Sequence, residues 1–426
     1  MKRKVLLIVN QFHGGGAQRV VSNLSLALAS EYDIHIAIFN DTDKIVYPYA
    51  GQMHAIKLPF HENTINNSVF VKGIRLMILT QKLRKLKRSH KIDVAVSFME
   101  ASNFANFFSH SQERLIFSVR TFLSGELNSI ESASMSRFLV RRLYNKADAI
   151  VVPSEGSGVD LVSNFSVQPQ KVRVIHNFID RITVGSKATE AIKNAFYERI
   201  FTKKVLINVG RLDKVKGQMY LPSILHEVRK SCPETRLVII GGGSLKGSLI
   251  REATKFHLRV YDDSVFSPDF PGPEEVDNYD LFLLGAKENP FKYLSRSTLF
   301  VFTSIYEGFP NVLIEAMNCG LPVISVDCHS GPREILAPDT YGATEEAEVY
   351  SQFGILLPEL HEAPSIPAFN AKNWASPICR LLTDKKLYDH YSAQSLLRGE
   401  QFDLPHIIQS WRRIIGTNTA GEGSSS

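Results

Sequence analysis

The feature that most constrains the fold is a repeated alternation of short, continuously apolar runs with helical segments. The first half of the chain has six such runs, at 5–10, 34–39, 93–98, 114–119, 149–154 and 172–177. The second half has six more, at 205–210, 237–242, 281–285, 299–304, 322–327 and 354–358. Continuous apolar runs indicate strands covered on both faces, and helices between them indicate parallel pairing. The pattern therefore predicts an α/β protein with doubly wound parallel sheets.

The series of strands is interrupted once, across a polar stretch from Asp180 to Lys204. A chain of 426 residues is long enough for two domains. We expect two Rossmann-like domains, at 1–183 and 184–400, facing each other across a cleft. A helix is predicted at 401–420 and a disordered tail at 421–426. The acidic, proline-rich segment 261–280 is predicted to be an unusually long loop.

Composition excludes several classes of protein. No apolar run approaches the roughly 20 residues of a membrane-spanning helix. The basic start of the chain resembles a signal peptide, but its apolar run is short and ends at Asn10. The four cysteines are widely spaced, which indicates neither a disulfide framework nor a cysteine metal site. We therefore expect a cytoplasmic protein.

Two glutamates in the segment YEGFPNVLIEAMNCGLPVIS are candidates for a binding site. Glu307 precedes a helix predicted to begin near Asn311, and Glu315 lies on that helix. Helical side chains lean towards the amino end, so both carboxylates are aimed at the same opening. They either gain only from the helix dipole or accept hydrogen bonds from sugar hydroxyls, while amides near Phe309 and Asn311 hold a phosphate. A hydrolase is less favoured, because its two acids must straddle the scissile bond.

Glycines and cations follow other predicted strands. Gly15 and Gly16 open a helix after the first strand, where bare amides favour an anion, although a flexible connection is the alternative. The spacing fits neither GxGxxG nor a phosphate loop. Gly210 ends a strand and is followed by Arg211 and Lys216. Two cations at a strand end suit a diphosphate, and a solvated surface is the alternative.

Taken together, these motifs resemble the retaining glycosyltransferases of family 4, which have the GT-B fold. The glutamate segment is similar to the E-x7-E signature of that family, and NVGRLDKVKG is similar to its diphosphate-binding segment. The family's amino-terminal glycine loop is similar to GGGAQRVV, and its usual entry to the interdomain linker is similar to VIHNFID. Flanking stretches common in enzymes of bacterial polysaccharide and lipopolysaccharide synthesis resemble NPFKYLSRSTLFVFTS and GPREIL. The resemblance runs along most of the chain. It also implies that the C-terminal helix crosses back to the first domain.

The resemblance implies a role for each matching residue. Arg211 and Lys216 would neutralise the donor diphosphate, and Glu307 would contact the donor sugar. The backbone amides of Phe309 and Asn311 would bind the donor diphosphate, and Glu315 would bind the nucleotide ribose. The backbone would approach the donor closely at Gly15, Gly16 and Gly210. Glu307, Arg211 and Lys216 are thus the expected catalytic residues, and neither metal nor cofactor is expected.

A basic segment in the first half suggests a membrane surface as a partner. Residues 72–91 form a predicted helix with eight cations, including Lys82, Arg84, Lys85 and Lys87. Such a helix either lies on an anionic membrane or packs its apolar stripe in the core with a solvated basic face. Nucleic acid is disfavoured, because no recognisable nucleic-acid module accompanies the charge.

We therefore predict a retaining hexosyltransferase that uses a nucleotide sugar, with UDP-sugar as the expected donor. Its acceptor would be a lipid-linked or polysaccharide glycan of the bacterial surface, at the inner face of the plasma membrane. The alternatives are another GT-B enzyme, such as a nucleotide-sugar epimerase or a phosphorylase, and a non-catalytic scaffold. An epimerase would act without an acceptor, and a phosphorylase would depend on phosphate.

Overall fold

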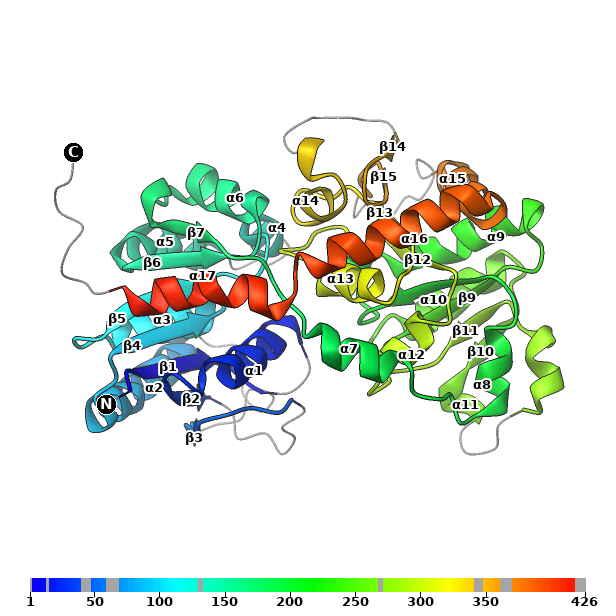
Figure 1. Cartoon of the computed structure of the whole chain (residues 1–426). Coiled ribbons are helices and arrows are strands. Elements are labelled where there is room, and N and C mark those ends of the chain that lie inside the picture. The colour runs from blue at the N-terminus through cyan, green and yellow to red at the C-terminus, as the bar shows by residue number, and fades with distance from the viewer. Residues whose placement is uncertain are drawn as a thin grey trace. The chain divides into compact units, whose positions relative to one another are not determined.

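The computed structural model describes residues 2–12, 15–39, 47–58, 69–128, 133–266, 271–340, 348–360 and 370–417. It separates into two compact units, one formed by 1–178 with 405–426 and the other by 179–404. The predicted tail 421–426 lies outside the described residues. Figure 1 shows the course of the chain through the elements named below.

The first unit contains the elements β1 (Lys4–Val9), α1 (Gly16–Leu28), β2 (Asp33–Ile38), β3 (Gln52–Ala55), α2 (Val69–His90), β4 (Val94–Phe98), α3 (Glu100–Phe108), β5 (Arg114–Ser118), α4 (Leu123–Asn128), α5 (Ala133–Leu143), β6 (Ala149–Val152), α6 (Glu155–Phe165), β7 (Val172–Val174) and α17 (Leu404–Gly416).

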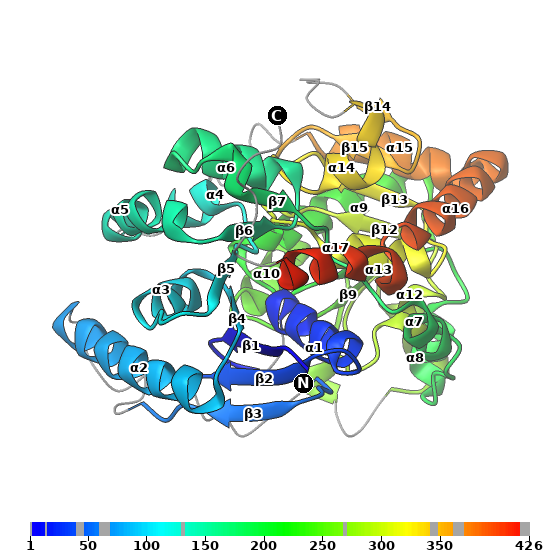
Figure 2. The same cartoon turned by 60° about the vertical axis from the view of Figure 1, so that its left-hand side comes forward.

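The described strands of this unit form one sheet in the order β3-β2-β1-β4-β5-β6-β7, and every pairing is parallel. Figure 2 shows α2 and α3 on one face of the sheet, with α1 and α17 on the other. Helix α17 joins this unit although it comes last in the chain. Its Trp411 is buried, and its ring lies 6.1 Å from that of Phe98 on β4. Burial of that large ring anchors the helix to the sheet.

The second unit contains the elements α7 (Arg181–Ala188), α8 (Ala195–Ile200), β8 (Val205–Val209), α9 (Leu221–Ser231), β9 (Arg236–Ile240), α10 (Lys246–Lys255), β10 (Val260–Asp262), α11 (Asp263–Phe266), β11 (Leu281–Leu283), α12 (Phe291–Leu294), β12 (Leu299–Phe302), α13 (Asn311–Asn318), β13 (Val323–Val326), α14 (Pro332–Leu336), β14 (Val349–Tyr350), β15 (Ile355–Leu357), α15 (Ala371–Thr383) and α16 (Lys385–Glu400). Its described strands form a sheet in the order β10-β11-β9-β8-β12-β13-β15-β14.

All twelve predicted strands are present, and the structure adds β3, β10 and β14. Each added strand lies at the edge of its sheet and has two to four residues. An edge strand needs no apolar run, because it is not covered on both faces and pairs on one side only. The prediction of one long loop at 261–280 is wrong, because several short elements lie in this segment. That segment includes the end of β10, helix α11 and a short 3-10 helix at Pro273–Asn278.

Helix α2 confirms the helix predicted at 72–91, but not all of its predicted cations lie on the surface. Its Leu79 and Leu83 are buried in the core of the first unit. Lys87 is also buried, and its ammonium lies 2.7 Å from the Glu113 carboxylate and 2.7 Å from the Asn106 side-chain oxygen. Burial lowers the pKa of Lys87 to about 8, although Glu113 opposes this shift. Lys87 therefore belongs to the interior and not to a membrane-facing surface.

Among the described helices, none combines the length and the apolar character needed to cross a membrane.

Replacing Lys87 should destabilise the first unit, because Glu113 would keep a buried charge without its partner. We expect Lys87→Met to lower the free energy of unfolding by about 3–5 kcal/mol, measured by urea denaturation followed by circular dichroism. The exposed Lys85 on the same helix provides the control. Lys85→Met should change stability by less than about 0.5 kcal/mol, and equal effects of the two changes would contradict the assignment.

Candidate functional site

The second unit has a topological switch point at strand β8. Strand β8 lies between β9 and β12, and the connection from β8 to β9 runs in the opposite direction to the connection from β12 to β13. Ligands of open parallel sheets bind outside the carboxyl ends of the strands at such points. The segment after β8 carries Arg211 and Lys216, and the segment after β12 carries Glu307 and Glu315.

Gly217 holds these two segments against each other. Its φ is 61°, and a Cβ at this position would lie 2.0 Å from the backbone oxygen of Thr303. The Thr303 hydroxyl donates to the Lys216 oxygen at 3.0 Å, and the Ile305 amide donates to the Val215 oxygen at 2.7 Å. Only glycine combines this backbone angle with so close an approach. The turn after β8 is thereby fixed against the loop that leaves β12.

This packing brings two of the predicted catalytic residues together. The Lys216 ammonium lies 2.5 Å from the Glu307 carboxylate. Both side chains are only partly shielded, with 25% of Lys216 and 13% of Glu307 exposed to solvent. The pair therefore lies at the surface of the switch point, where a ligand can replace either contact. A cation held beside an anion suits a ligand that has both a phosphate and hydroxyl groups.

Helix α13 supplies the remaining residues of the E-x7-E segment. Glu315 is 5% exposed, while Phe309 is buried and its ring lies 5.4 Å from that of Phe402. The side-chain oxygen of Asn311, the first residue of α13, is buried and has no hydrogen-bond partner among the described residues. Gly331, in the loop after β13, packs against Pro310, the residue before α13. A Cβ at position 331 would lie 2.5 Å from the Pro310 side chain.

The other predicted phosphate ligands have hydrogen-bond or ion-pair partners of their own. Arg211 is 82% exposed and forms an ion pair with Asp213 at 3.0 Å. Gly210 donates its amide to Ile240 at 2.9 Å, which continues the pairing of β8 with β9. Gly15 precedes α1 and Gly16 begins it, both in the first unit, and the Gly15 amide donates to the Tyr47 hydroxyl at 3.3 Å.

The carboxyl edge of the first sheet holds acidic residues that sequence reasoning missed. Glu100 begins α3 directly after β4, which lies beside β1 at the switch point of this sheet. Burial and the neighbouring Glu126 raise the pKa of Glu100 to about 7. The residue before it, Met99, has a φ of 73°, an angle that non-glycine residues rarely adopt away from functional sites.

A partly buried cation lies at the same edge. Arg120 follows β5 and donates a hydrogen bond to the side-chain oxygen of Asn177. Burial lowers the pKa of the Arg120 guanidinium to about 9. The position of Glu100 and Arg120 directly after predicted strands was visible in the sequence. Their burial and the approach of Glu126 depend on helices that the sequence does not place.

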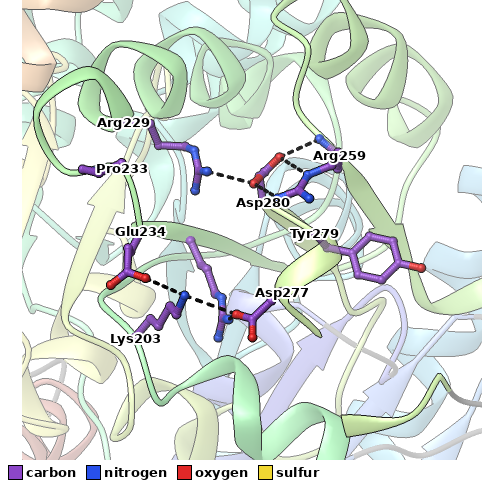
Figure 3. A pocket seen from close by; sticks show the side chains of 9 residues that line it. Lys203, Arg229, Pro233, Glu234, Arg259, Asp277, Tyr279 and Asp280 are labelled. Atoms are coloured by element: carbon purple, nitrogen blue, oxygen red, sulfur yellow. Dashed lines mark hydrogen bonds and ion pairs between the residues drawn. The ribbon is translucent and has the colours of Figure 1, made fainter. Parts of the chain in front are cut away.

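A hollow of about 170 Å³ in the second unit is a weaker candidate (Figure 3). It lies where β9 begins, at the opposite end from the switch-point segments. Its charges already neutralise one another: Lys203 pairs with Glu234 at 2.7 Å, and Asp280 pairs with Arg229 at 3.0 Å and Arg259 at 2.9 Å. A surface network of satisfied ion pairs explains this hollow without a ligand.

Comparison with known proteins identifies the family. Residues 14–181 match the model of Glycosyltransferase Family 4, and residues 203–384 match that of Glycosyl transferases group 1. A Campylobacter jejuni N-acetylgalactosamine-N,N'-diacetylbacillosaminyl-diphospho-undecaprenol 4-alpha-N-acetylgalactosaminyltransferase is 28% identical over 96% of this chain and 98% of its own. The amylovoran biosynthesis glycosyltransferase AmsD of Erwinia amylovora is 27% identical over 80% of this chain and 85% of its own.

Solved structures support the fold. Anabaena HepE in complex with UDP and glucose matches with a TM-score of 0.68 at 15% identity, over 97% of this chain and 99% of its own. The sucrose-phosphate synthase of Thermosynechococcus elongatus gives a TM-score of 0.71 at 17% identity, over 98% and 100% of the two chains. The chain has the GT-B fold and belongs to the glycosyltransferases, with a family 4 domain followed by a group 1 domain.

Proposed function

We propose that this glycosyltransferase moves a hexose or N-acetylhexosamine, with retention, from a UDP-sugar to a lipid-linked or polysaccharide acceptor of the bacterial surface. The observation that carries the proposal is the Lys216–Glu307 pair at the β8/β12 switch point, with Glu315 buried on the adjoining helix. The Campylobacter jejuni relative is named for an undecaprenol-linked acceptor, and a solved neighbour was captured with UDP. Both support the choice of donor and acceptor.

The proposed roles follow from charge and position. When the bond between the sugar and the diphosphate breaks, negative charge grows on the phosphate oxygens, and Lys216 and Arg211 stabilise it. Glu307 accepts hydrogen bonds from the donor sugar, and Glu315 accepts them from the ribose. The acceptor oxygen then bonds to the anomeric carbon on the face that the diphosphate leaves, and its proton passes to the departing phosphate. This step needs neither a carboxylate nucleophile nor a metal.

Removing either member of the pair should abolish most of the turnover but little of the stability. We expect Lys216→Ala and Glu307→Gln each to lower kcat by ~10²–10³-fold, measured as UDP release in the presence of acceptor. Melting temperatures should stay within ~2 °C of the unchanged protein, because the pair is partly exposed. Glu315→Gln should instead weaken nucleotide binding, measured by calorimetry without added metal.

The exposed Lys214 lies in the same 3-10 turn as Lys216 and provides the matched control. Lys214→Ala should keep near-normal kcat, and near-normal transfer by both site variants would end the proposal. Conversion of the nucleotide sugar without acceptor would indicate an epimerase, and dependence on phosphate would indicate a phosphorylase. Binding without turnover on any acceptor would favour a scaffold.

We further propose that Glu100 contacts the acceptor. Burial and the neighbouring Glu126 raise the pKa of Glu100, so the fold is less stable when Glu100 is ionised. Residues that cost stability in this way are frequent at functional sites. A carboxyl group that titrates near neutral pH is also suited to accept a hydrogen bond from a hydroxyl group of the acceptor.

Glu100→Gln should therefore stabilise the protein and reduce its activity. The folded pKa of about 7 exceeds the ordinary value of 4.5, so the wild-type protein loses stability as the pH rises between these values. At pH 8 the variant should melt ~2–4 °C higher than wild type, and this gain should vanish near pH 4.5. Transfer at pH 8 should fall at least ~10-fold. A variant that is destabilised at pH 8, or fully active, would contradict the proposal.

An anionic membrane surface is the proposed partner of the first unit. Helix α5 exposes Met135 and Phe138, and the Arg142 guanidinium lies 5.6 Å from the Phe138 ring. Spacings of three and four residues place these side chains on one helical face. On α2, Lys82, Lys85 and Arg88 are exposed, whereas Lys87 is buried. Exposed apolar tips beside cations are typical of surfaces that lie on anionic lipid.

Neutralising the α2 cations should release the protein from anionic vesicles. The triple variant Lys82→Gln, Lys85→Gln and Arg88→Gln should co-sediment at least ~10-fold less with phosphatidylglycerol vesicles. The reason is that each cation near an anionic surface contributes about 1 kcal/mol to the binding free energy. The control neutralises three exposed lysines of the second unit, which are Lys255, Lys385 and Lys386. Equal losses in both variants, or none in either, would leave α2 as an ordinary solvated helix.

A further inference from the structure

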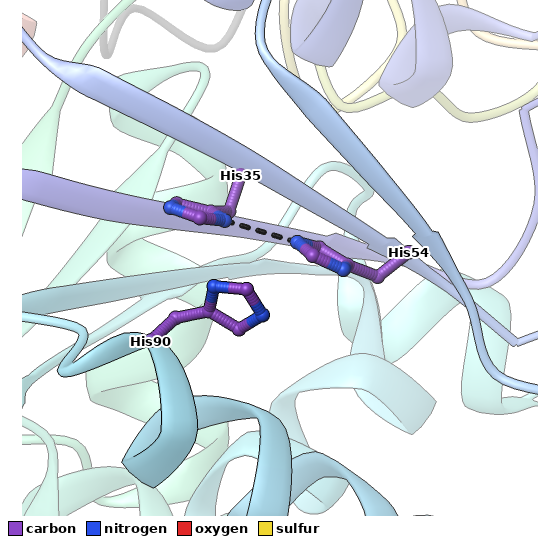
Figure 4. Close-up of side chains that lie close together, drawn as sticks. All are labelled: His35, His54 and His90. Atoms are coloured by element: carbon purple, nitrogen blue, oxygen red, sulfur yellow. Dashed lines mark hydrogen bonds between the residues drawn. The ribbon is translucent and has the colours of Figure 1, made fainter.

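Three histidines that are far apart in the sequence meet beside strand β3 of the first unit. His35 lies on β2, His54 on β3, and His90 is the last residue of α2 (Figure 4). In the parallel pairing of β2 with β3, His54 lies opposite Ala37 and His35 lies opposite Gln52. His35 and Ala37 share a face, so His35 and His54 are diagonal neighbours on that face. Helix α2 then brings His90 to the same place.

The three rings converge. His35 Nδ1 lies 2.9 Å from His54 Nε2, and one nitrogen from each of the three rings lies within 4.8 Å of the others. The His35 and His54 rings are stacked, and the His90 ring is tilted by 55° to both. Four-coordinate zinc with Zn–N bonds of about 2.0–2.1 Å places ligand nitrogens about 3.3 Å apart. A small shift of the His90 side chain would therefore complete a three-histidine site.

Imidazole binds a metal through a nitrogen lone pair, which requires its neutral form. Burial lowers the pKa of His35, and burial together with His35 lowers that of His54 to about 4. Three charged or titratable groups also act on His35: Asp33 raises its pKa, whereas His90 and Lys4 lower it. The geometry offers a cation one ring nitrogen from each of the three histidines.

Asp33 lies where an outer-shell carboxylate is usually found. Its Oδ2 lies 3.7 Å from His35 Nε2, the nitrogen that does not face His54. That Nε2 is buried and makes no hydrogen bond to the described residues, and His35 is only 3% exposed. Metal-binding histidines commonly donate their second ring N–H to a carboxylate. A metal on Nδ1 would place the ring proton on Nε2, where it faces Asp33. The buried Nε2 would then have a hydrogen-bond acceptor in the Asp33 carboxylate.

We propose that His35, His54 and His90 bind one divalent transition-metal ion, with zinc as the natural occupant. Imidazole ligands suit Zn²⁺, Co²⁺, Ni²⁺ and Cu²⁺ rather than Mg²⁺ or Ca²⁺. The ion fastens the four-residue edge strand β3 and the end of α2 to the sheet, with water in the fourth position. This site is structural. It lies in the first unit, whereas the proposed donor residues Lys216 and Glu307 lie in the second.

The test is a metal titration of the full-length protein without a polyhistidine tag, after treatment with EDTA and dialysis. We expect one equivalent of Co²⁺ to bind with the visible absorption of a tetrahedral complex, and Zn²⁺ to displace it. The melting temperature should rise with Zn²⁺ concentration, as binding to the folded state requires. Transfer activity per folded molecule should be unchanged by metal removal. Absence of stoichiometric Co²⁺ binding would overturn the proposal.

Variants locate the ion. His54→Gln combined with His90→Gln should abolish the stoichiometric site, whereas the exposed His390→Gln should bind like wild type. Asp33→Asn should weaken the affinity ~10–100-fold while keeping the stoichiometry, as expected for a positioning residue. Should the double variant not fold, X-ray absorption of the zinc-loaded wild type decides the matter. Three imidazole ligands support the site, and two or fewer exclude it.

Discussion

The close approach of the turn after β8 to the loop after β12 determines the chemistry of the second unit. At Gly217 the two backbones lie too close for any side chain, and this contact turns Lys216 towards Glu307. Arg211, which is not held in this way, extends into solvent. A cation and an anion from different crossovers can thus act on one ligand, because the packing is set before the ligand arrives.

Two ionisable groups of the first unit, Lys87 and Glu100, have opposite electrostatic surroundings. Lys87 and Glu113 neutralise each other, so their burial is compatible with a purely structural role. Glu100 instead lies near a second acid, and burial makes its ionised form unfavourable. The first arrangement loses stability when one partner is removed, whereas the second gains stability. The contrast distinguishes a core ion pair from a carboxyl group whose ionisation the fold disfavours.

Much of the fold and the position of the candidate site could be predicted from the sequence, because the signals are local. A strand covered on both faces needs a continuous apolar run, and twelve such runs were recognisable. Glu307 and Glu315 lie on one strand-to-helix connection, so their spacing alone aimed them at one opening. Strands β3, β10 and β14 were missed because edge strands need no such run. Lys87 appeared to be a surface cation, because its partner Glu113 lies 26 positions away.

The sequence by itself therefore determined the two doubly wound sheets, the segments at their carboxyl ends and the kinds of side chain that those segments carry. Only the tertiary structure decided which of these side chains meet. Lys216 met Glu307 and Arg211 did not, because backbone packing at Gly217 acts between strands that are not consecutive in sequence. His35, His54 and His90 came together because parallel pairing and the end of α2 join distant segments. Contacts of that kind depend on three-dimensional packing, which no local spacing records.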